Sequence, residues 1–491
     1  MEAEYRRIEA ERVDAKDWKH IFSRECASRK TSIMQGMHHT LRRPGIRSLG
    51  PGAPAAEYFP FHGMGFTVPS MGDRPGLHNV SAGSHDRQHG LSTFDISLAL
   101  QYGQGRGSAQ LIEFISEHVK LSHDPPYKDW SCVLTAGNTS ALDIALRMFG
   151  EPGDHILIEE YAYPVIFEAG TPLGYHFVSV KMDSLGLLPR ELDTILSEWD
   201  EGARGSRKPH LLYVVPTGQN PTGATTTLDR KLDIYRVMQK HNIYILEDDP
   251  YYFIQMSQYT RLGDRMALTE ARHRPSPASI EEFIEGLVPS YLHIDVDGRV
   301  FRMDSFSKII APGARMGWLT ASRQVTERVV RIHETSVQNP SGFSQLALFK
   351  LLHDDWGSIG FMKWLWHLQS EYTRRRNALL DAIELHLPKA IVTYVAPTSG
   401  FFVWISLDWR KHPDAMAKSA RVIEQELYDG AIERGTLVVP GSWFIVEESR
   451  DSMQEVHFRL TFAAVPVDVI EEAIECLGLA IKRAFGFVAV T

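Results

Sequence analysis

The sequence predicts an α/β protein in which a largely parallel β-sheet is followed by a smaller α+β unit. Short apolar runs alternate with amphipathic stretches between about residues 95 and 345, which is the pattern of strands joined by crossover helices. After about residue 345 the order changes to long helices followed by separated strands. The length of 491 residues also exceeds what one hydrophobic core usually supports.

Three segments follow from this pattern. Residues 1–94 combine a charged amphipathic helix, over residues 1 to about 30, with an irregular stretch over residues 42–95 that is rich in Gly, Pro, Ser and His. Residues 95–345 form a large domain, and residues 346–491 form a small one.

Seven short apolar runs in the large domain are predicted strands, because they are rich in β-branched residues and bounded by turn-forming residues. They cover residues 132–134, 155–158, 176–180, 210–215, 243–247, 300–303 and 318–320. Helices are predicted between them, among others over residues 140–149, 188–198 and 228–241. A parallel sheet of this kind binds its ligand at the carboxyl ends of its strands.

The small domain is predicted to begin with two helices and to continue with alternating strands and helices. The helices cover residues 344–353, 362–386, 417–434 and 467 to about 485. The strands cover residues 391–395, 401–407, 436–439 and 455–462.

Composition restricts the classes of function. Hydrophobic residues make up 43% of the chain and charged residues 23%, as in ordinary globular proteins. A net charge of -9 provides no basic excess for nucleic acid. The three cysteines, Cys26, Cys132 and Cys476, are widely separated, so we expect neither a disulfide framework nor a metal site. The charged N-terminus lacks an apolar signal core and no apolar stretch is long enough for a membrane span, so we expect a cytoplasmic protein.

Two glycine-rich clusters follow predicted strands. Residues 135–140 (TAGNTS) open a predicted helix, which Asn138 or Ser140 could cap and whose free N–H groups would favour a phosphate. Residues 216–223 (PTGQNPTG) turn tightly and can project the Asn220 amide into a site. The alternatives are an ordinary helix start and a rigid connecting loop.

Three successive carboxylates, Glu247, Asp248 and Asp249, end another predicted strand. Buried carboxylates are costly unless they are paired, so one of them is expected to meet a cation. That cation could be a metal ion or the protonated ring nitrogen of an organic cofactor, and no histidine cluster accompanies these residues.

Lys308 is the most informative residue of the chain. It ends a predicted strand between serines and is followed seven residues later by Arg315. A partly desolvated lysine beside cationic groups has a lowered pKa and can attack a carbonyl to form a Schiff base. Ser305, Ser307 and Arg315 supply donors suited to a phosphate. The alternative is a surface lysine near a loop arginine.

Arg459 lies inside the alternating strand pattern of residues 457–462 (HFRLTF), which places its guanidinium on one face of a sheet. A guanidinium in that position suits a substrate carboxylate or a structural salt bridge.

Together and in this order, several motifs resemble those of the class I/II aminotransferases, which are fold-type I enzymes dependent on pyridoxal 5′-phosphate (PLP). The motifs are LQYG, TAGNTSAL, VPTGQNPTG, EDDPYYFIQM, RMDSFSKIIAPGARMGW and LVVPGSWF, and the resemblance runs from about residue 18 to 487. It is strongest to the fungal aromatic-amino-acid and 2-aminoadipate (kynurenine) aminotransferases. The resemblance implies a mostly parallel seven-stranded sheet, PLP as cofactor and a homodimer with shared active sites.

The resemblance also implies an activity. An aromatic amino acid or 2-aminoadipate would exchange its amino group with a 2-oxo acid such as 2-oxoglutarate by a ping-pong mechanism. Lys308 would carry the cofactor and act as the base, and Asp248 would pair with the pyridine nitrogen. Tyr251 and Asn220 would hydrogen-bond the phenolic oxygen of PLP, while Tyr163 would stack on its ring.

The remaining implied roles concern the phosphate and the substrate. The phosphate would be held by Asn138, Thr139, Ser305, Ser307 and Arg315 of one subunit and by Tyr102 of the other. Arg459 would bind the substrate carboxylate, with Asn220 beside it. Residues 1–94 would cover the site and bring Gly52 near the substrate.

Two other functions fit parts of this pattern. A PLP-dependent C–S or β-lyase would use the same motifs. A PLP-binding regulator would need an N-terminal DNA-binding module, which the Gly/Pro-rich composition of residues 31–95 does not resemble.

Overall fold

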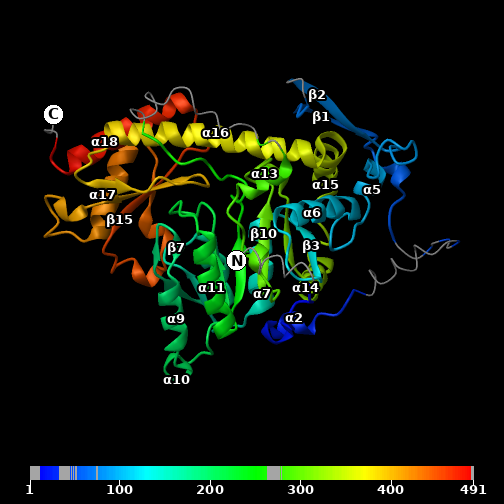
Figure 1. Cartoon of the computed structure of the whole chain (residues 1–491), viewed down its shortest axis with the longest axis horizontal. Coiled ribbons are helices and arrows are strands. Elements are labelled where there is room, and N and C mark those ends of the chain that lie inside the picture. The colour runs from blue at the N-terminus through cyan, green and yellow to red at the C-terminus, as the bar shows by residue number, and fades with distance from the viewer. Residues whose placement is uncertain are drawn as a thin grey trace.

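A computed structural model describes residues 12–32, 45, 47, 49, 52–72, 76–261, 277 and 279–487. The seven strands predicted for the large domain are all present and form one sheet, in the order β3-β11-β10-β9-β8-β4-β5. Figure 1 shows β3 and β10 of this sheet in the middle of the large domain. Their bounds are β3 (Trp130–Thr135), β4 (His155–Glu159), β5 (His176–Val180), β8 (Leu211–Val214), β9 (Tyr244–Asp248), β10 (Val300–Ser305) and β11 (Gly317–Ser322). The seven-stranded sheet implied by the resemblance is therefore confirmed.

The sheet is parallel except at one strand. β10, β9, β8, β4 and β5 run in the same direction, whereas β11 is antiparallel to both β10 and β3. β11 follows β10 after a short loop and returns beside it, with Asp304 opposite Trp318. That loop contains Lys308 and Arg315, so the reversal places both residues at one edge of the sheet.

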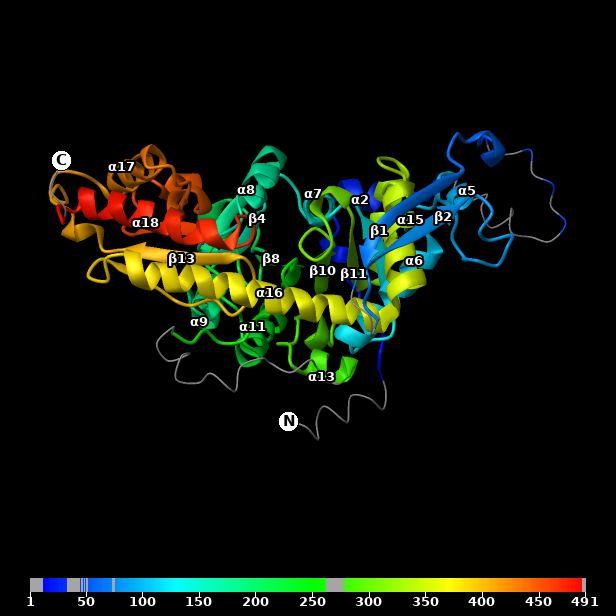
Figure 2. The same ribbon diagram turned by 90° about the horizontal axis from the view of Figure 1, so that it is seen from above.

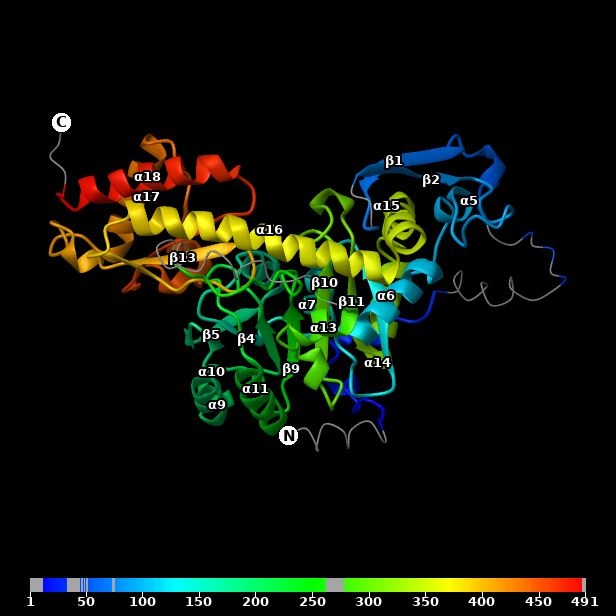
Figure 3. The same cartoon turned by 45° about the horizontal axis from the view of Figure 1, so that its top comes forward.

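Helices pack on this sheet in two groups (Figure 3). α7 (Asn138–Phe149) contacts α14 (Arg323–Glu334) and α2 (Arg24–Ser28), while α6 (Ala109–Ser122) contacts α13 (Ile280–Glu285) and α15 (Gly342–Phe349). The remaining elements of this part are α5 (Ile96–Ala99), α8 (Val165–Gly170), α9 (Pro189–Ser197), α10 (Glu201–Arg204), α11 (Leu228–His241) and the short pair β6 (Met182–Asp183) and β7 (Gly186–Leu187).

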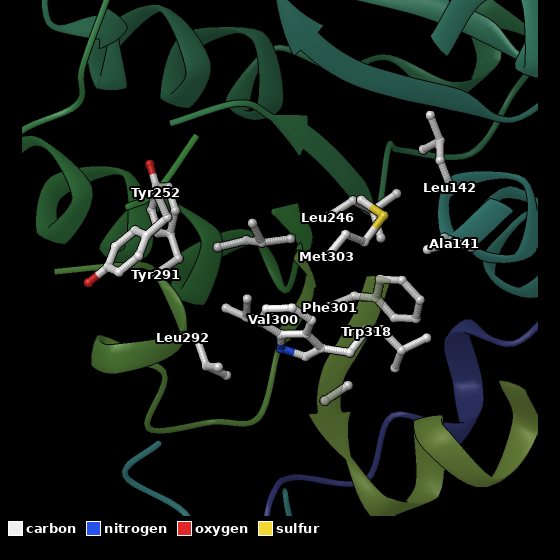
Figure 4. Close-up of a cluster of buried hydrophobic side chains, with 14 of the residues drawn as sticks. Ala141, Leu142, Leu246, Tyr252, Tyr291, Leu292, Val300, Phe301, Met303 and Trp318 are labelled. Carbon is white, nitrogen blue, oxygen red and sulfur yellow. The ribbon is translucent and has the colours of Figure 1, made fainter. Parts of the chain in front are cut away.

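The core around β9, β10 and β11 is made of large apolar side chains from several elements (Figure 4). Leu246, Phe301 and Trp318 come from three neighbouring strands and are at most 1% exposed, and Leu142 of α7 belongs to the same buried cluster. Burying such a side chain contributes about 1.5–3 kcal/mol. This packing fixes the strand ends from which the site residues extend.

The C-terminal part has its own antiparallel sheet, in the order β12-β13-β15-β14. Figure 2 shows β13 of this sheet alongside α16. Its strands are β12 (Val392–Tyr394), β13 (Phe402–Leu407), β14 (Val439–Pro440) and β15 (Val456–Thr461). α17 (Ala420–Glu433) and α18 (Val467–Ala484) pack beside it. α16 (Gly357–His386) runs from the large sheet to the small one and follows a π-helical turn at Lys350–Trp356. Three of the four predicted strands of this part are present with bounds shifted by at most one residue, whereas the strand predicted over residues 436–439 is observed only as the short β14 at Val439–Pro440.

The expectations for residues 1–94 were partly wrong. The predicted helix over residues 1 to about 30 is reduced, within the described residues 12–32, to the turn Lys19–Ile21 and to α2; residues 1–11 lie outside the described residues. Trp18 is 1% exposed, and its indole N–H donates to Asp297 O, so tertiary contacts replace helical hydrogen bonds there. The stretch predicted as irregular contains a hairpin of β1 (Gly63–Pro69) and β2 (Leu77–Gly83) beside α15.

Candidate active site

A cavity of about 540 Å³ lies where the ends of the large sheet face β13 and β15 of the small sheet. It brings together all but two of the predicted site residues. Those lining it are Asn138, Thr139, Tyr163, Asn220, Asp248, Tyr251, Ser305, Ser307, Lys308, Arg315 and Arg459. They come from segments that follow β3, β4, β8, β9 and β10, together with β15. The volume is within the range of small-molecule sites.

Lys308 projects into this cavity without a partner of its own. Its Nζ forms no hydrogen bond or ion pair with any described residue and lies 6.0 Å from the ring centre of Tyr251 and 5.9 Å from that of Phe401. Burial lowers the pKa of the Lys308 ammonium, and Arg459 lowers it further, while Asp248 acts in the opposite direction. A lysine in this environment has a larger neutral fraction and can act as a nucleophile or a base.

Asp248, at the end of β9, accepts one hydrogen bond on each carboxylate oxygen. Asn138 Nδ2 donates to Oδ1 at 2.7 Å, and the hydroxyl of Tyr213 donates to Oδ2 at 2.8 Å. Burial raises the pKa of Asp248, whereas these two donors and the charge of Lys308 lower it. Asp248 is 7% exposed and faces the cavity, so its charge is available to a cation placed there.

The two neighbouring carboxylates turn away from the cavity and pair with Arg302. The Nη1 atom of Arg302 lies 3.0 Å from Glu247 and 3.1 Å from Asp249, and its Nε and Nη2 atoms bind Asp304 at 2.9 and 2.8 Å. Glu247 and Asp249 therefore have Arg302 as the cation that was expected beside these carboxylates. No group of three or more potential metal ligands occurs among the residues that the structure describes.

Arg459 enters the cavity from β15. Its Nη1 donates to Asn220 Oδ1 at 2.7 Å, and its guanidinium carbon lies 4.4 Å from the ring centre of Phe402 and 5.1 Å from that of Phe444. The Nε atom is buried and has no hydrogen-bond partner, and no described carboxylate forms an ion pair with Arg459. The structural salt bridge considered for this residue is therefore not formed, and its donors remain available to an anion.

The Pro216–Gly223 loop is held against the small sheet by close backbone contact. Gly218 has φ +56°, and a Cβ added there would lie 2.5 Å from the Cα of Gly400, itself at φ +73°. Only glycine tolerates both the left-handed conformation and this approach. Asn220, whose bond to Pro221 is cis, is thereby brought within reach of Arg459.

The corner formed by α7 and the loop after β10 presents donors for an anion. α7 begins at Asn138, and the backbone N–H groups of Asn138 and Thr139 donate to no described residue, whereas that of Ser140 donates to the carbonyl of Gly137. Its N-cap is Gly137, without a side-chain cap, so the predicted capping by Asn138 or Ser140 was wrong. Gly137 lies against Arg315, whose Nη1 and Nη2 donate to the backbone at Pro312 and Ala136. Thr139, Ser305 and Ser307 complete this corner.

Aromatic side chains form much of the remaining wall. The ring of Tyr251 packs edge-on against Phe401 and Phe402, at 5.2 and 5.8 Å between ring centres. Burial raises the pKa of both Tyr251 and Tyr163, and Asp248 adds to the effect, so the hydroxyls are held protonated as donors.

Two predicted residues do not line the cavity of the single chain. Tyr102 is 63% exposed and borders a different cavity with Gln101, Asn339 and Gln345. Gly52 is exposed, and nothing lies within 4 Å of a Cβ built on it. Their implied roles remain predictions.

Sequence reasoning missed Tyr213, Phe444 and the function of Arg302. Tyr213 lies in the middle of an apolar run and gave no polar signal, although a tyrosine in a fully buried strand generally needs a partner for its hydroxyl. Phe444 belongs to the LVVPGSWF motif, and Arg302 stands two residues from Asp304, as a same-face pair on a strand does.

The unpaired groups of the cavity fit PLP. The cofactor has an aldehyde for an amine, a ring nitrogen for a carboxylate and a phosphate for the donors at a helix N-terminus. Lys308 supplies an amine without a partner, Asp248 a buried carboxylate without an ion pair, and the α7 corner the phosphate donors. Arg459, with its buried unpartnered Nε, is left for a substrate anion.

Comparison with known proteins agrees with this geometry. The family model for aminotransferase class I and II matches residues 87–477. An aromatic amino acid aminotransferase of Schizosaccharomyces pombe is 40% identical over 478 residues, which are 96% of this chain and 98% of the relative. An L-tyrosine:2-oxoglutarate aminotransferase of Serpula lacrymans is 34% identical, over 88% of this chain and 84% of the relative. The crystal structure of the aminotransferase Aro8 from Candida albicans superimposes with a TM-score of 0.87 at 36% identity and covers 97% of this chain and 100% of that one.

Proposed function

The chain belongs to the class I and II aminotransferases, and we propose that it transfers the amino group of an aromatic amino acid to 2-oxoglutarate. The names of the aromatic and tyrosine:2-oxoglutarate relatives support these substrates. The observation that carries the proposal is the placement of Lys308 and Arg459 on opposite sheets around one cavity with an aromatic wall. 2-Aminoadipate is the second donor to test.

PLP, the cofactor of this family, supplies an electron sink that stabilises negative charge at the substrate Cα. In this chain Asp248 would hold its ring nitrogen, and Tyr251 and the free Nδ2 of Asn220 would bind its phenolic oxygen. Tyr163 would stack on the ring. The phosphate would rest on the first turn of α7, with Thr139, Ser305, Ser307 and Arg315 around it.

The chain's own residues then orient the substrate and move its proton. Arg459 binds the carboxylate, and its contacts with Phe402, Phe444 and Asn220 keep the guanidinium in one position. Lys308 Nζ accepts the proton from the substrate Cα, and its lowered pKa leaves more of the amine in the neutral form that can accept a proton. Since amino acid and oxo acid use the same arginine and the same lysine, they bind in turn, and ping-pong kinetics follow.

We further propose a homodimer in which Tyr102 completes the partner's site. Exposed apolar side chains lie on η2 (Ala56–Tyr58), β2, α5 and α15, and Tyr102 follows α5 in the chain. The elements β2, α5 and α15 lie together at one end of the molecule (Figures 1 and 3). Tyr58 is 79% exposed, Leu77 74% and Phe343 42%, and such a patch is typical of an interface. Within the described residues no helix is long and apolar enough to cross a membrane. The cytoplasmic location expected from the sequence remains a proposal.

An amino-donor screen with 2-oxoglutarate tests the reaction. We expect turnover with tyrosine, phenylalanine or tryptophan, no turnover in Lys308→Ala, and a pyridoxyl group on the Lys308 peptide after borohydride reduction. Failure of every donor with PLP-loaded wild type would refute the substrates. Release of pyruvate without an oxo acid would instead indicate the C–S or β-lyase.

Subunit mixing tests the shared site. Lys308→Ala and Tyr102→Ala homodimers are each expected to be impaired. After they are unfolded and refolded together, half of the dimers are mixed, and each mixed dimer has one intact site, so about a quarter of wild-type activity should return. No recovery, in a sample shown to contain mixed dimers, would contradict the role of Tyr102.

A further inference from the structure

Asp248 is surrounded differently from the two carboxylates beside it. Glu247 and Asp249 share the guanidinium of Arg302 at 3.0 and 3.1 Å, and all three side chains are fully buried. Asp248 forms no ion pair with any described residue, and both of its oxygens accept from neutral donors. The chain thus pairs two of the three adjacent carboxylates with an internal cation and leaves the third for a cation in the cavity.

The first donor is the hydroxyl of Tyr213, on the neighbouring strand β8. Tyr213 is 0% exposed, and its hydroxyl lies 2.8 Å from Asp248 Oδ2. Strands β8 and β9 are paired in register at Tyr213 and Leu246, two residues before Asp248, so the sheet sets the distance between the two side chains. Burial and the charge of Asp248 both raise the pKa of Tyr213, so its hydroxyl remains a proton donor.

The second donor is Asn138, the first residue of α7. Its Nδ2 donates to Asp248 Oδ1 at 2.7 Å and to the carbonyl of Met303 at 3.0 Å, while its Oδ1 is buried without a partner. The Asp248 carboxylate and the Met303 carbonyl only accept hydrogen bonds, so the amide nitrogen of Asn138, and not its oxygen, must face them. The side chain is then occupied at Asp248, and only the backbone N–H of Asn138 remains for a phosphate.

We propose that Tyr213 and Asn138 are positioning residues that hold the Asp248 carboxylate in one orientation and stabilise its charge, so that the proton shared with the cofactor stays on the ring nitrogen. The inference rests on the proposed roles of Asp248 and PLP. Donors to a carboxylate stabilise its ionised form. When one donor is lost, the carboxylate becomes more basic and draws the shared proton toward itself, and the ring becomes a weaker electron sink.

Tyr213→Phe removes one donor with little change in volume, and Tyr244→Phe is its matched control. Tyr244 is also 0% exposed on the adjacent strand β9, but its hydroxyl has no hydrogen-bond partner among the described residues. Each enzyme is loaded with PLP labelled with ¹⁵N at the ring nitrogen, and the chemical shift of that nitrogen reports its protonation. We expect wild type and Tyr244→Phe at the protonated position and Tyr213→Phe displaced toward the unprotonated one. The kcat of Tyr213→Phe should fall about 10- to 100-fold, the size of one hydrogen bond to a charged group, with KM nearly unchanged.

If the ring-nitrogen resonance of a folded, PLP-loaded Tyr213→Phe enzyme stays at the wild-type position, the proposal is overturned. If Tyr213→Phe does not fold, Asn138→Ala decides, because it removes the donor on the other oxygen and should displace the resonance in the same direction; an undisplaced resonance there would also overturn it. Failure of the proposed function looks different, because wild type itself would then bind no PLP or transfer no amino group.

Discussion

Replacing Arg459 with methionine removes the substrate's proposed carboxylate partner while it keeps an unbranched side chain between Phe402 and Phe444. The guanidinium uses Nη1 on Asn220, and its buried Nε has no partner, so Nε and Nη2 can bind both carboxylate oxygens. Truncating one partner of a buried, hydrogen-bonded charge pair costs about 2–5 kcal/mol. At about 1.4 kcal/mol per factor of ten, kcat/KM for tyrosine should fall about 30- to 5,000-fold.

The assay compares tyrosine with tyramine, which has no carboxylate, in wild type, in Arg459→Met and in Arg410→Met. Arg410 is exposed over the ring of Trp409 and serves as the matched control. Wild type and Arg410→Met should prefer tyrosine strongly. Arg459→Met should lose this preference, because without the guanidinium the carboxylate of tyrosine has no partner and no longer favours tyrosine over tyramine. The cofactor's visible absorbance should be retained.

The stability of the cofactor-free protein provides a second measurement. Arg459 is partly buried without a counter-ion, and burial lowers its pKa, so the folded state bears a desolvation cost there. Its removal should leave thermal stability unchanged or raise it. The reasoning is refuted if Arg459→Met keeps kcat/KM for tyrosine within about threefold of wild type, or if its preference for tyrosine over tyramine persists.

Three other predictions concern the residues around the site. Arg302→Met should lower the free energy of unfolding by about 3–5 kcal/mol at pH 8, because three buried carboxylates lose their cation. The loss should shrink at pH 5, below the folded pKa of about 6 for Asp249 and of about 7 for Asp304, where protons neutralise these two carboxylates; equal losses in urea unfolding at both pH values would contradict this. Lys231 is buried, and its pKa is lowered from 10.5 to about 8. Between these two pH values the folded state binds fewer protons than the unfolded state, so the free energy of unfolding rises with pH. Lys231→Met should lack this rise when unfolding is measured over the same pH range. Gly218→Ala should destabilise the protein by about 1–3 kcal/mol and should also lower kcat/KM, because Gly218 has a positive φ and lies against the backbone of Gly400. Gly430→Ala, in α17 with open space around it, is the control and should be neutral or stabilising. Similar unfolding midpoints for the two variants would disprove this explanation.

Local patterns were sufficient for the strands of both sheets and for the residues around Lys308. The apolar runs of the large sheet are buried on both faces, so they stand out in the sequence whatever their order in space. Asp248 directly follows such a run, Lys308 and Asn220 each stand five residues after one, and the carboxyl ends of neighbouring parallel strands meet at one edge. The positions of these three residues after predicted strands therefore predicted that they belong to the active site.

The N-terminal part was predicted less well. The charged pattern of the first 30 residues favours a helix, but Trp18 is buried against the large domain through long-range contacts that the pattern does not encode. The hairpin of β1 and β2 escaped detection because its glycines and its mixed burial obscure the alternation of a strand.

By itself, the sequence determined which strands exist, which lysine and arginine are placed for chemistry, and that one of three adjacent carboxylates would face a ligand. Only the tertiary structure decided which of the three carboxylates is paired with an arginine and which faces the cavity. β10 brings Arg302 to Glu247 and Asp249. β8 and α7 bring the neutral donors Tyr213 and Asn138 to Asp248. The physical reason is that a hydrogen bond or an ion pair depends on distances of about 3 Å between residues far apart along the chain. Those distances are set by strand order and helix packing, which local patterns do not contain.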